Sequence, residues 1–156
     1  MNKKGFTLTE LLAVIAIIAI ISLIAVPNVI DIYDSTKSNN MISDAKRFIS
    51  LAKLEMNSDY TLRQEDSVEF SITDLNKNGD FQMEIYNGAK SIPDPDGGDE
   101  GYYDNSSYVR FYKENNTMNY CIYLVGSKRY LGEKDATVPS CVHEDKLSSD
   151  GIVHVK

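Results

Sequence analysis

The segment Lys3–Glu10 reads KKGFTLTE, and an uninterrupted apolar run, Leu11–Val26, follows it directly and stops at Pro27. Glu10 is the only charged residue from position 6 to position 26, and it lies almost at the start. A helix over these positions would be roughly 32 Å long at about 1.5 Å per residue, which matches the ~30 Å hydrocarbon core of a bilayer. The run is therefore long enough to span a membrane.

The charges near this run predict its orientation and single out one residue. Lys3 and Lys4 precede the run and no matching basic cluster follows it, so we expect the N-terminus in the cytoplasm and the chain beyond Pro27 outside. A carboxylate in a spanning helix costs about 2.5–3.5 kcal/mol at the centre and less near an end. Glu10 is therefore a candidate functional residue that needs a partner.

The residues around the expected start of the helix also carry a family resemblance. Lys4-Gly5 followed by Phe6–Leu12 and a long aliphatic helix resembles the class III signal of type IV pilin precursors. The resemblance implies that a prepilin peptidase cuts after Gly5 and methylates the new amino group of Phe6. It also implies that Glu10 acts in assembly and that Pro27 bends the helix, as many pilins carry a proline there.

Two simpler explanations of the apolar run stay open. A secretory signal peptide would have an apolar region of about 7–15 residues followed by a small-residue cleavage site, and this run is longer. A simple membrane anchor fits the length, but it gives no reason for Gly5-Phe6 or for Glu10.

The length of 156 residues leaves room for one soluble domain beside this helix, because a domain typically takes about 100–200 residues. We expect residues 1–5 to be a leader peptide and residues 6–27 a hydrophobic transmembrane or filament-core helix. Residues 28–156 are then an extracellular pilin-like globular domain. Cys121 and Cys141 both lie on the expected outer side, where disulfides persist, and we interpret them as one bridge.

The net charge of the chain is −7, which bears on its partners. Binding of nucleic acid depends on phosphate neutralisation by Lys and Arg, so no direct nucleic-acid partner is expected, although a local basic patch stays possible. No nucleophile elbow, phosphate-binding loop or Cys-x-x-Cys motif is present. The protein is therefore not expected to be an enzyme or to need a cofactor.

Beyond Pro27 the apolar residues recur at helical spacing, with Met41, Ala45, Phe48 and Ala52 on one stripe. One long helix bent near Pro27 explains both patterns, because proline removes an internal hydrogen bond and clashes with the preceding turn. A helix break at Ser38–Asn40 is the alternative.

After this helix the apolar pattern changes to a period of two, which predicts strands. Val68–Ile72 and Phe81–Ile85 flank the turn signal Asn76–Gly79 and are expected to form a hairpin. Ser91–Ser107 is expected to be a long surface loop. Further strands are expected over Tyr108–Lys113, Met118–Val125, Lys128–Leu131 and Gly151–Val155. The predicted fold class is α+β, with a long N-terminal hydrophobic and then amphipathic helix packed on a small antiparallel sheet, which the pilin resemblance also implies.

Two acidic stretches and one histidine are candidate metal ligands. Asp74–Asp80 follows the start of a calcium loop but lacks the closing acid, so a turn is favoured. The acidic loop that contains Asp94, Asp96, Asp99 and Glu100 is interpreted as solvated. His143 lies two residues after Cys141, but zinc-ligand spacing is absent, and no metal site is predicted.

Seven tyrosines crowd one third of the chain. Exposed rings could contact a neighbouring subunit, a sugar or a host surface, but packing on the sheet is the favoured use. These residues are Tyr102, Tyr103, Tyr108, Tyr112, Tyr120, Tyr123 and Tyr130.

The leading functional hypothesis is a structural subunit of a type IV pilus filament that serves adhesion, surface motility or aggregation. The precursor would be held in the cytoplasmic membrane until the prepilin peptidase and the pilus assembly machinery convert it into a homo-oligomeric extracellular filament. Alternatives are a minor pilin, a pseudopilin of a type II secretion or competence apparatus, and a membrane-anchored extracellular binding module whose loops hold an ion or a glycan.

Overall fold

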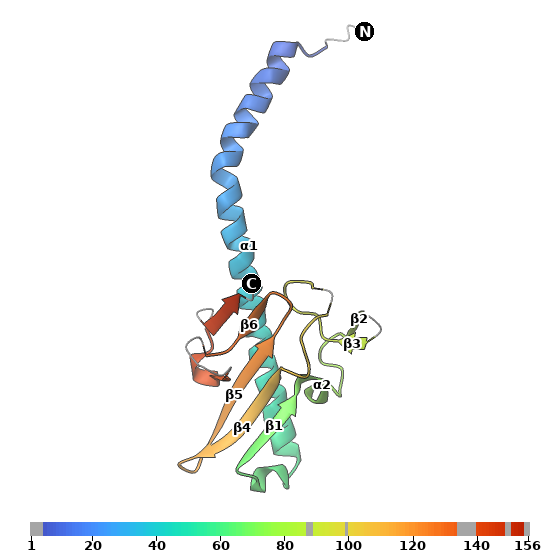
Figure 1. Ribbon diagram of the computed structural model, residues 1–156, viewed down its shortest axis with the longest axis vertical. Helices are drawn as coiled ribbons and strands as arrows, with labels where there is room; N and C mark the ends of the chain where they lie inside the picture. Colours follow the sequence, from blue (N-terminus) through green and yellow to red (C-terminus); the bar gives the residue numbers. More distant parts are fainter. Residues whose placement is uncertain (1–4, 87–88, 99, 134–139, 149–150, 155–156) are drawn as a thin grey trace. The chain divides into compact units, whose positions relative to one another are not determined.

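The computed structural model describes the following residues: 5–86, 89–98, 100–133, 140–148 and 151–154 (Figure 1). The chain divides into two compact units, Met1–Thr36 and Lys37–Lys156.

The first element is one long helix, α1, which runs from Leu8 to Ser58. Its backbone stays helical through residues 27 and 28, and also through Ser38–Asn40, where a break was the alternative. The side chains of residues 27 and 28 are outside the described set, so the predicted bend at Pro27 stays a prediction. By length and composition, the N-terminal part of α1 is apolar enough to cross a membrane.

In the second unit, the apolar stripe of α1 forms one side of the core. Met41, Ala45, Phe48 and Ala52 are fully buried. Phe48 stacks on Phe81 with 4.3 Å between ring centroids. Full burial of a Met or Phe side chain, as at Met41 and Phe48, contributes roughly 1.5–3 kcal/mol, so this stripe holds the helix on the sheet.

The other side of the core is an antiparallel sheet with the strand order β1-β4-β5-β6-β8, and β7 also pairs with β5. In Figure 1 the strands β1, β4 and β5 lie across the C-terminal part of α1. The strands are β1 (Ser67–Ser71), β4 (Tyr108–Glu114), β5 (Thr117–Val125), β6 (Arg129–Leu131), β7 (Val142–His143) and β8 (Ile152–His154). The predicted α+β class, with a long helix packed on a small antiparallel sheet, is confirmed.

The central hairpin β4–β5 forms where the sequence predicted it. Asn115 and Asn116 both have positive φ, 49° and 62°, as a tight hairpin turn of the primed type requires. Val109 and Phe111 are fully buried and face the helix, so the alternate residues of β4 face the other side of the sheet.

The predicted hairpin between residues 68–72 and 81–85 is wrong. β1 pairs instead with β4, in the register Phe70↔Val109. Residues Ile72–Leu75 form a short helix, α2, because the Ser71 hydroxyl accepts a hydrogen bond from the Asp74 backbone N–H at 3.0 Å and caps it. The following strands, β2 (Glu84–Tyr86) and β3 (Ala89–Ser91), form a separate two-stranded sheet within the described part of the chain.

The turn expected at Asn76–Gly79 closes α2 rather than joining two strands. The Asn76 side chain accepts from the Phe81 backbone N–H at 2.7 Å and donates to the Phe81 carbonyl at 3.0 Å. Gly79 has φ of +76°, a conformation that glycine adopts without strain. Two short 3₁₀ helices, η1 (Leu62–Gln64) and η2 (Glu144–Lys146), complete the second unit.

Candidate functional site

The residues that would be processed lie in an open part of the chain. The Phe6 side chain is 89% exposed. A Cβ placed on Gly5 would meet no other heavy atom within 4 Å. The peptide bond between these two residues is therefore accessible from the side of the Gly5 α-carbon. Lys3 and Lys4, which flank it, lie outside the described residues.

Glu10 has a partner within its own chain. Its Oε2 accepts the Thr7 backbone N–H and the Thr7 hydroxyl, each at 2.8 Å. The Glu10 backbone N–H in turn donates to the Thr7 hydroxyl oxygen at 3.3 Å. This reciprocal arrangement is a capping box, and it satisfies two of the backbone N–H groups that the start of a helix leaves without partners. The spacing T-x-x-E is the sequence signal of this box, which an interpretation of Glu10 from its charge and from the family resemblance did not include.

The helix that follows presents apolar side chains to its surroundings. A soluble monomer rarely exposes a contiguous apolar patch larger than a few hundred Å², so a surface of this kind indicates a membrane or a protein partner. The exposed large apolar residues in this stretch are Leu8, Leu11, Leu12, Val14, Ile15, Ile17, Ile18, Ile20, Ile21, Leu23, Ile24 and Val26.

Residues 1–26 match the family model described as the prokaryotic N-terminal methylation motif, which is the class III signal of type IV prepilins. The motif indicates a type IV pilin-like or pseudopilin protein with a hydrophobic N-terminal helix. Such a signal implies processing by a prepilin peptidase and entry into a pilus-type assembly machinery, and it indicates a membrane-anchored precursor. No curated protein and no solved structure matches the chain.

In the second unit, Cys121 and Cys141 form a disulfide. It joins β5 to the residue before β7, whose pairing with β5 consists of Cys121↔His143 and Ile122↔Val142. The bridge therefore fastens the C-terminal part of the chain to the centre of the sheet.

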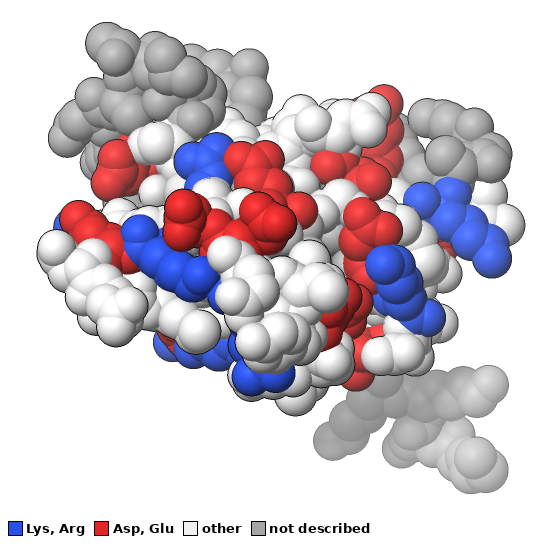
Figure 2. All heavy atoms as spheres, turned by 90° about the horizontal axis from the view of Figure 1, so that it is seen from below, with Lys and Arg blue, Asp and Glu red and all other residues white. Residues whose placement is uncertain are grey.

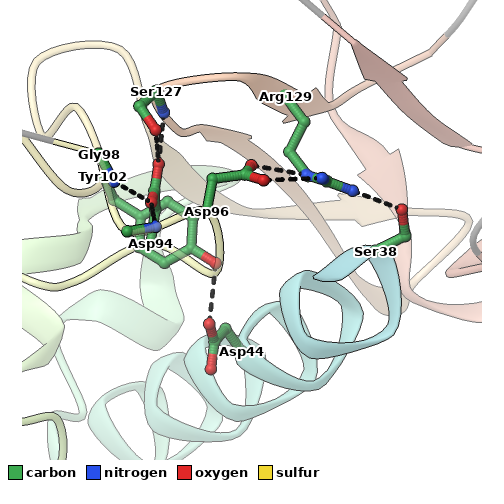
Figure 3. Close-up of polar contacts among 9 residues, drawn as sticks. Ser38, Asp44, Asp94, Asp96, Gly98, Tyr102, Ser127 and Arg129 are labelled. Carbon is green, nitrogen blue, oxygen red and sulfur yellow. Dashed lines mark hydrogen bonds and ion pairs between the residues drawn. The ribbon is translucent and has the colours of Figure 1, made fainter. Parts of the chain in front are cut away.

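Two acids of the loop that the sequence predicted to be solvated have buried side chains, Asp94 and Asp96, whereas Glu100 is exposed as predicted. Asp94 is only 5% exposed, and its Oδ1 accepts from the backbone N–H groups of Gly97 and Gly98 at 2.9 and 3.3 Å. Its Oδ2 accepts from the backbone N–H and the hydroxyl of Ser127 (Figure 3). Burial alone would raise the pKa of Asp94, but the hydrogen bonds from Ser127, Gly98 and Gly97 outweigh it and lower the pKa below its ordinary value.

The Asp96 side chain is only 6% exposed, and it pairs with Arg129. The guanidinium donates from Nε to Oδ2 at 2.6 Å and from Nη2 to Oδ1 at 2.7 Å. Its Nη1 donates to the Ser38 hydroxyl on α1 at 2.7 Å. Figure 3 shows this one side chain between the acidic loop and the helix. Asp99, the third acid of the loop, lies outside the described residues.

A third polar contact connects the same loop to α1. The Tyr102 hydroxyl, in a side chain that is 1% exposed, donates to Asp44 Oδ2 at 2.8 Å. Burial raises the pKa of Asp44, and the hydrogen bond from Tyr102 and the charge of Arg47 only partly offset this. These contacts explain why Asp94, Tyr102 and the Asp96 side chain are buried although they belong to a connecting segment. Within the described part of the chain, no group of three or more His, Cys, Asp or Glu is placed to hold a metal ion.

One face of the second unit has a mixed surface charge. On the face seen in Figure 2, acidic and basic side chains are interspersed, and they form no continuous basic surface there. This distribution does not favour a phosphate backbone as the ligand of that face.

Proposed function

We propose that the protein is a structural subunit of a type IV pilus filament. The observation that carries the proposal is the exposed apolar part of α1, which lies within the class III signal matched at residues 1–26. In the precursor this part of the helix would lie in the cytoplasmic membrane with the N-terminus in the cytoplasm. After cleavage the same surface would be buried between copies of the chain in the filament core.

The capping box supports a specific role for Glu10 in this assembly. Oε2 already accepts both donors of Thr7, whereas Oε1 has no hydrogen bond among the described residues. Cleavage after Gly5 creates a cationic amine on Phe6, and neither this charge nor the carboxylate can stay unpaired in an apolar bundle without a cost of several kcal/mol. We expect Oε1 of a subunit already in place to accept the amine of an incoming subunit, which would define the axial register between the two.

The remaining residues have supporting roles in this proposal. Pro27 would bend α1 at the point where it leaves the membrane or the filament core. The Cys121–Cys141 disulfide would keep the C-terminal segment on the sheet in the extracellular environment. Residues 1–5 would be the leader and residues 28–156 the extracellular domain.

A pseudopilin of a type II secretion or competence apparatus would have the same N-terminal stretch and the same helix. The two functions differ in abundance and length, because a pilus subunit builds long surface filaments whereas a pseudopilin builds a short periplasmic or wall-spanning assembly. Filaments sheared from the cell surface, examined by electron microscopy and by mass spectrometry, therefore test the proposal. We expect this chain as the main component, with an N-terminus at methylated Phe6. Filaments that lack this chain, or that contain it with Met1 intact, would contradict it.

A further inference from the structure

The sheet has a second face, on the side opposite to α1, where several tyrosines gather. Val109, Phe111, Ile122 and Leu124 are fully buried and point toward the helix. Side chains alternate along a strand, so the residues between them in β4 and β5 point the other way. We propose that this outer face binds a neutral oligosaccharide. The proposal concerns the second unit alone and does not rest on the filament role.

Three rings cross the outer face from strand to strand and form what we call the tyrosine row, Tyr108, Tyr123 and Tyr130. Tyr108 and Tyr123 are directly opposite each other in the β4–β5 register, and their ring centroids are 5.8 Å apart. The centroids of Tyr123 and Tyr130 are 6.0 Å apart. All three side chains are partly exposed. Rings on a rigid sheet offer a large contact area at low cost in conformational entropy.

The row continues into a groove of about 650 Å³, which is within the range of small-ligand sites. Arg110 connects the tyrosine row with the groove, because its guanidinium lies 5.1 Å from the centroid of the Tyr108 ring and the residue also lines the groove. Tyr112 and His143 form another part of the lining, with the Tyr112 hydroxyl 2.6 Å from His143 Nδ1. The Cys121–Cys141 disulfide borders the groove as well.

The charges in the groove favour a neutral ligand. Arg110 pairs with Glu69, to which its Nε donates at 2.8 Å. Glu114 and Glu133 add two carboxylates to the lining, and Lys113 adds one further cation, whose Nζ donates to the Arg63 carbonyl at 2.9 Å. A polyanion such as nucleic acid or an acidic polysaccharide would meet these carboxylates without a surplus of cations to offset them.

A sugar is chemically complementary both to the tyrosine row and to the groove. The C–H faces of a pyranose ring carry a faint positive potential and pack on the negative faces of aromatic rings. Its hydroxyl groups both donate and accept hydrogen bonds, as do the tyrosine hydroxyls, while the carboxylates accept and the guanidinium donates. A chain of several sugar units would extend from the groove along the tyrosine row.

The proposal can be tested by titrating the full chain with neutral hexasaccharides, namely cellohexaose, chitohexaose and maltohexaose. A zwitterionic detergent without a sugar headgroup keeps the apolar helix soluble and does not compete. Because the chain contains no tryptophan, tyrosine fluorescence reports on the rings, and calorimetry gives an independent affinity. A hyaluronan hexasaccharide and a short oligothymidylate serve as anionic probes.

Tyr108→Ala and Tyr123→Ala should each weaken binding about tenfold, as expected for aromatic anchors at the centre of a contact surface. Tyr123→Phe keeps the ring and should lose far less. Tyr60→Ala is the matched control, because Tyr60 is 68% exposed and is not part of the row. If Tyr108→Ala or Tyr123→Ala lowers the melting temperature of the chain, its affinity is no longer informative. The affinities of Tyr112→Ala and Tyr112→Phe are then compared instead, because Tyr112 lines the groove.

Saturable binding of one neutral hexasaccharide, weakened by the row variants and unchanged by Tyr60→Ala, would support the site. The proposal would be overturned if none of the three neutral probes bound, if only the anionic probes bound, or if Tyr60→Ala had the same effect as Tyr123→Ala.

Discussion

Asp96 and Arg129 form a bidentate ion pair in which both side chains are almost completely removed from solvent, with exposures of 6% and 4%. The two residues are 33 positions apart, and the pair holds the acidic loop against β6. Burial of either charge alone would be costly, so the pair stabilises this arrangement only when both partners are present.

Removal of one partner should therefore destabilise the fold strongly. Arg129→Met should lower the free energy of unfolding by about 3–5 kcal/mol, because it removes the two hydrogen bonds and the positive charge that offset the burial of the Asp96 carboxylate. The exposed pair Lys53–Glu144 provides the control, and Lys53→Met should cost only about 0–1 kcal/mol. Denaturant unfolding of the full chain in detergent measures both, and equal effects at the two pairs would refute the argument.

The Asp44 carboxyl should make stability depend on pH. Its pKa is raised in the fold, mainly by burial, so its contribution is fully present below the unfolded pKa and is lost as the pH rises through the folded pKa. Asp44→Asn removes this loss while it keeps an oxygen that accepts the Tyr102 hydroxyl. We expect the variant to be at least as stable as the parent at pH 7 and to gain no stability from this site on acidification.

Melting temperatures of both proteins between pH 3 and pH 8 check this. A parallel shift of the two curves would show that Asp44 does not titrate differently in the folded chain.

The disulfide should stabilise the second unit. In the chain-entropy model, closing a loop of 20 residues contributes about 3 kcal/mol. The double variant Cys121→Ala/Cys141→Ala, or reduction of the native protein, should lower the melting temperature and release β7 from β5. Hydrogen exchange at Val142 and His143 would report the release, and an unchanged melt would contradict the prediction.

Gly5→Val should block processing without disturbing the chain itself. A Cβ at Gly5 meets nothing within 4 Å, so any effect arises from recognition by the peptidase, for which we expect close approach to the backbone. The variant should remain in the membrane with its leader attached, whereas Leu8→Val should be processed normally. Mass spectrometry of the membrane fraction distinguishes the two forms, and a matured Gly5→Val chain would rule out the proposed requirement.

The capping box of Glu10 and its proposed charge pairing can be tested separately by two substitutions. Glu10→Val removes both the carboxylate and the capping box, which typically contributes about 0.5–2 kcal/mol. Glu10→Gln keeps a side chain that can complete the box and removes only the charge. We expect both variants to insert and to lose the leader, because neither change makes insertion more costly.

Both variants should fail to build filaments if the charge pairs with the amine of an incoming subunit. Electron microscopy of cells that carry only the variant chain provides the measurement. Normal filaments with Glu10→Gln would mean that the capping box, not the charge, is what assembly needs.

The N-terminal stretch could be interpreted from the sequence because its signals are local. The apolar run, its flanking lysines and the Gly5-Phe6 junction are contiguous, and the matched family model covers this same region. The stripe of α1 and the β4–β5 hairpin were predicted for the same reason, since a helical period or an alternating period followed by a turn signal is a property of neighbouring residues.

The tertiary structure decided which distant residues meet. Alternation placed Val68–Ile72 in a strand but did not reveal that β1 pairs with β4, because strand pairing depends on long-range packing that no local pattern encodes. The composition of the acidic loop predicted a solvated segment. Ser127 and Arg129, each 33 positions from its partner, allow the carboxylates of Asp94 and Asp96 to be buried. The tyrosine row likewise depends on long-range strand pairing. Its three rings share one face of the sheet only because β4, β5 and β6 pair in this register.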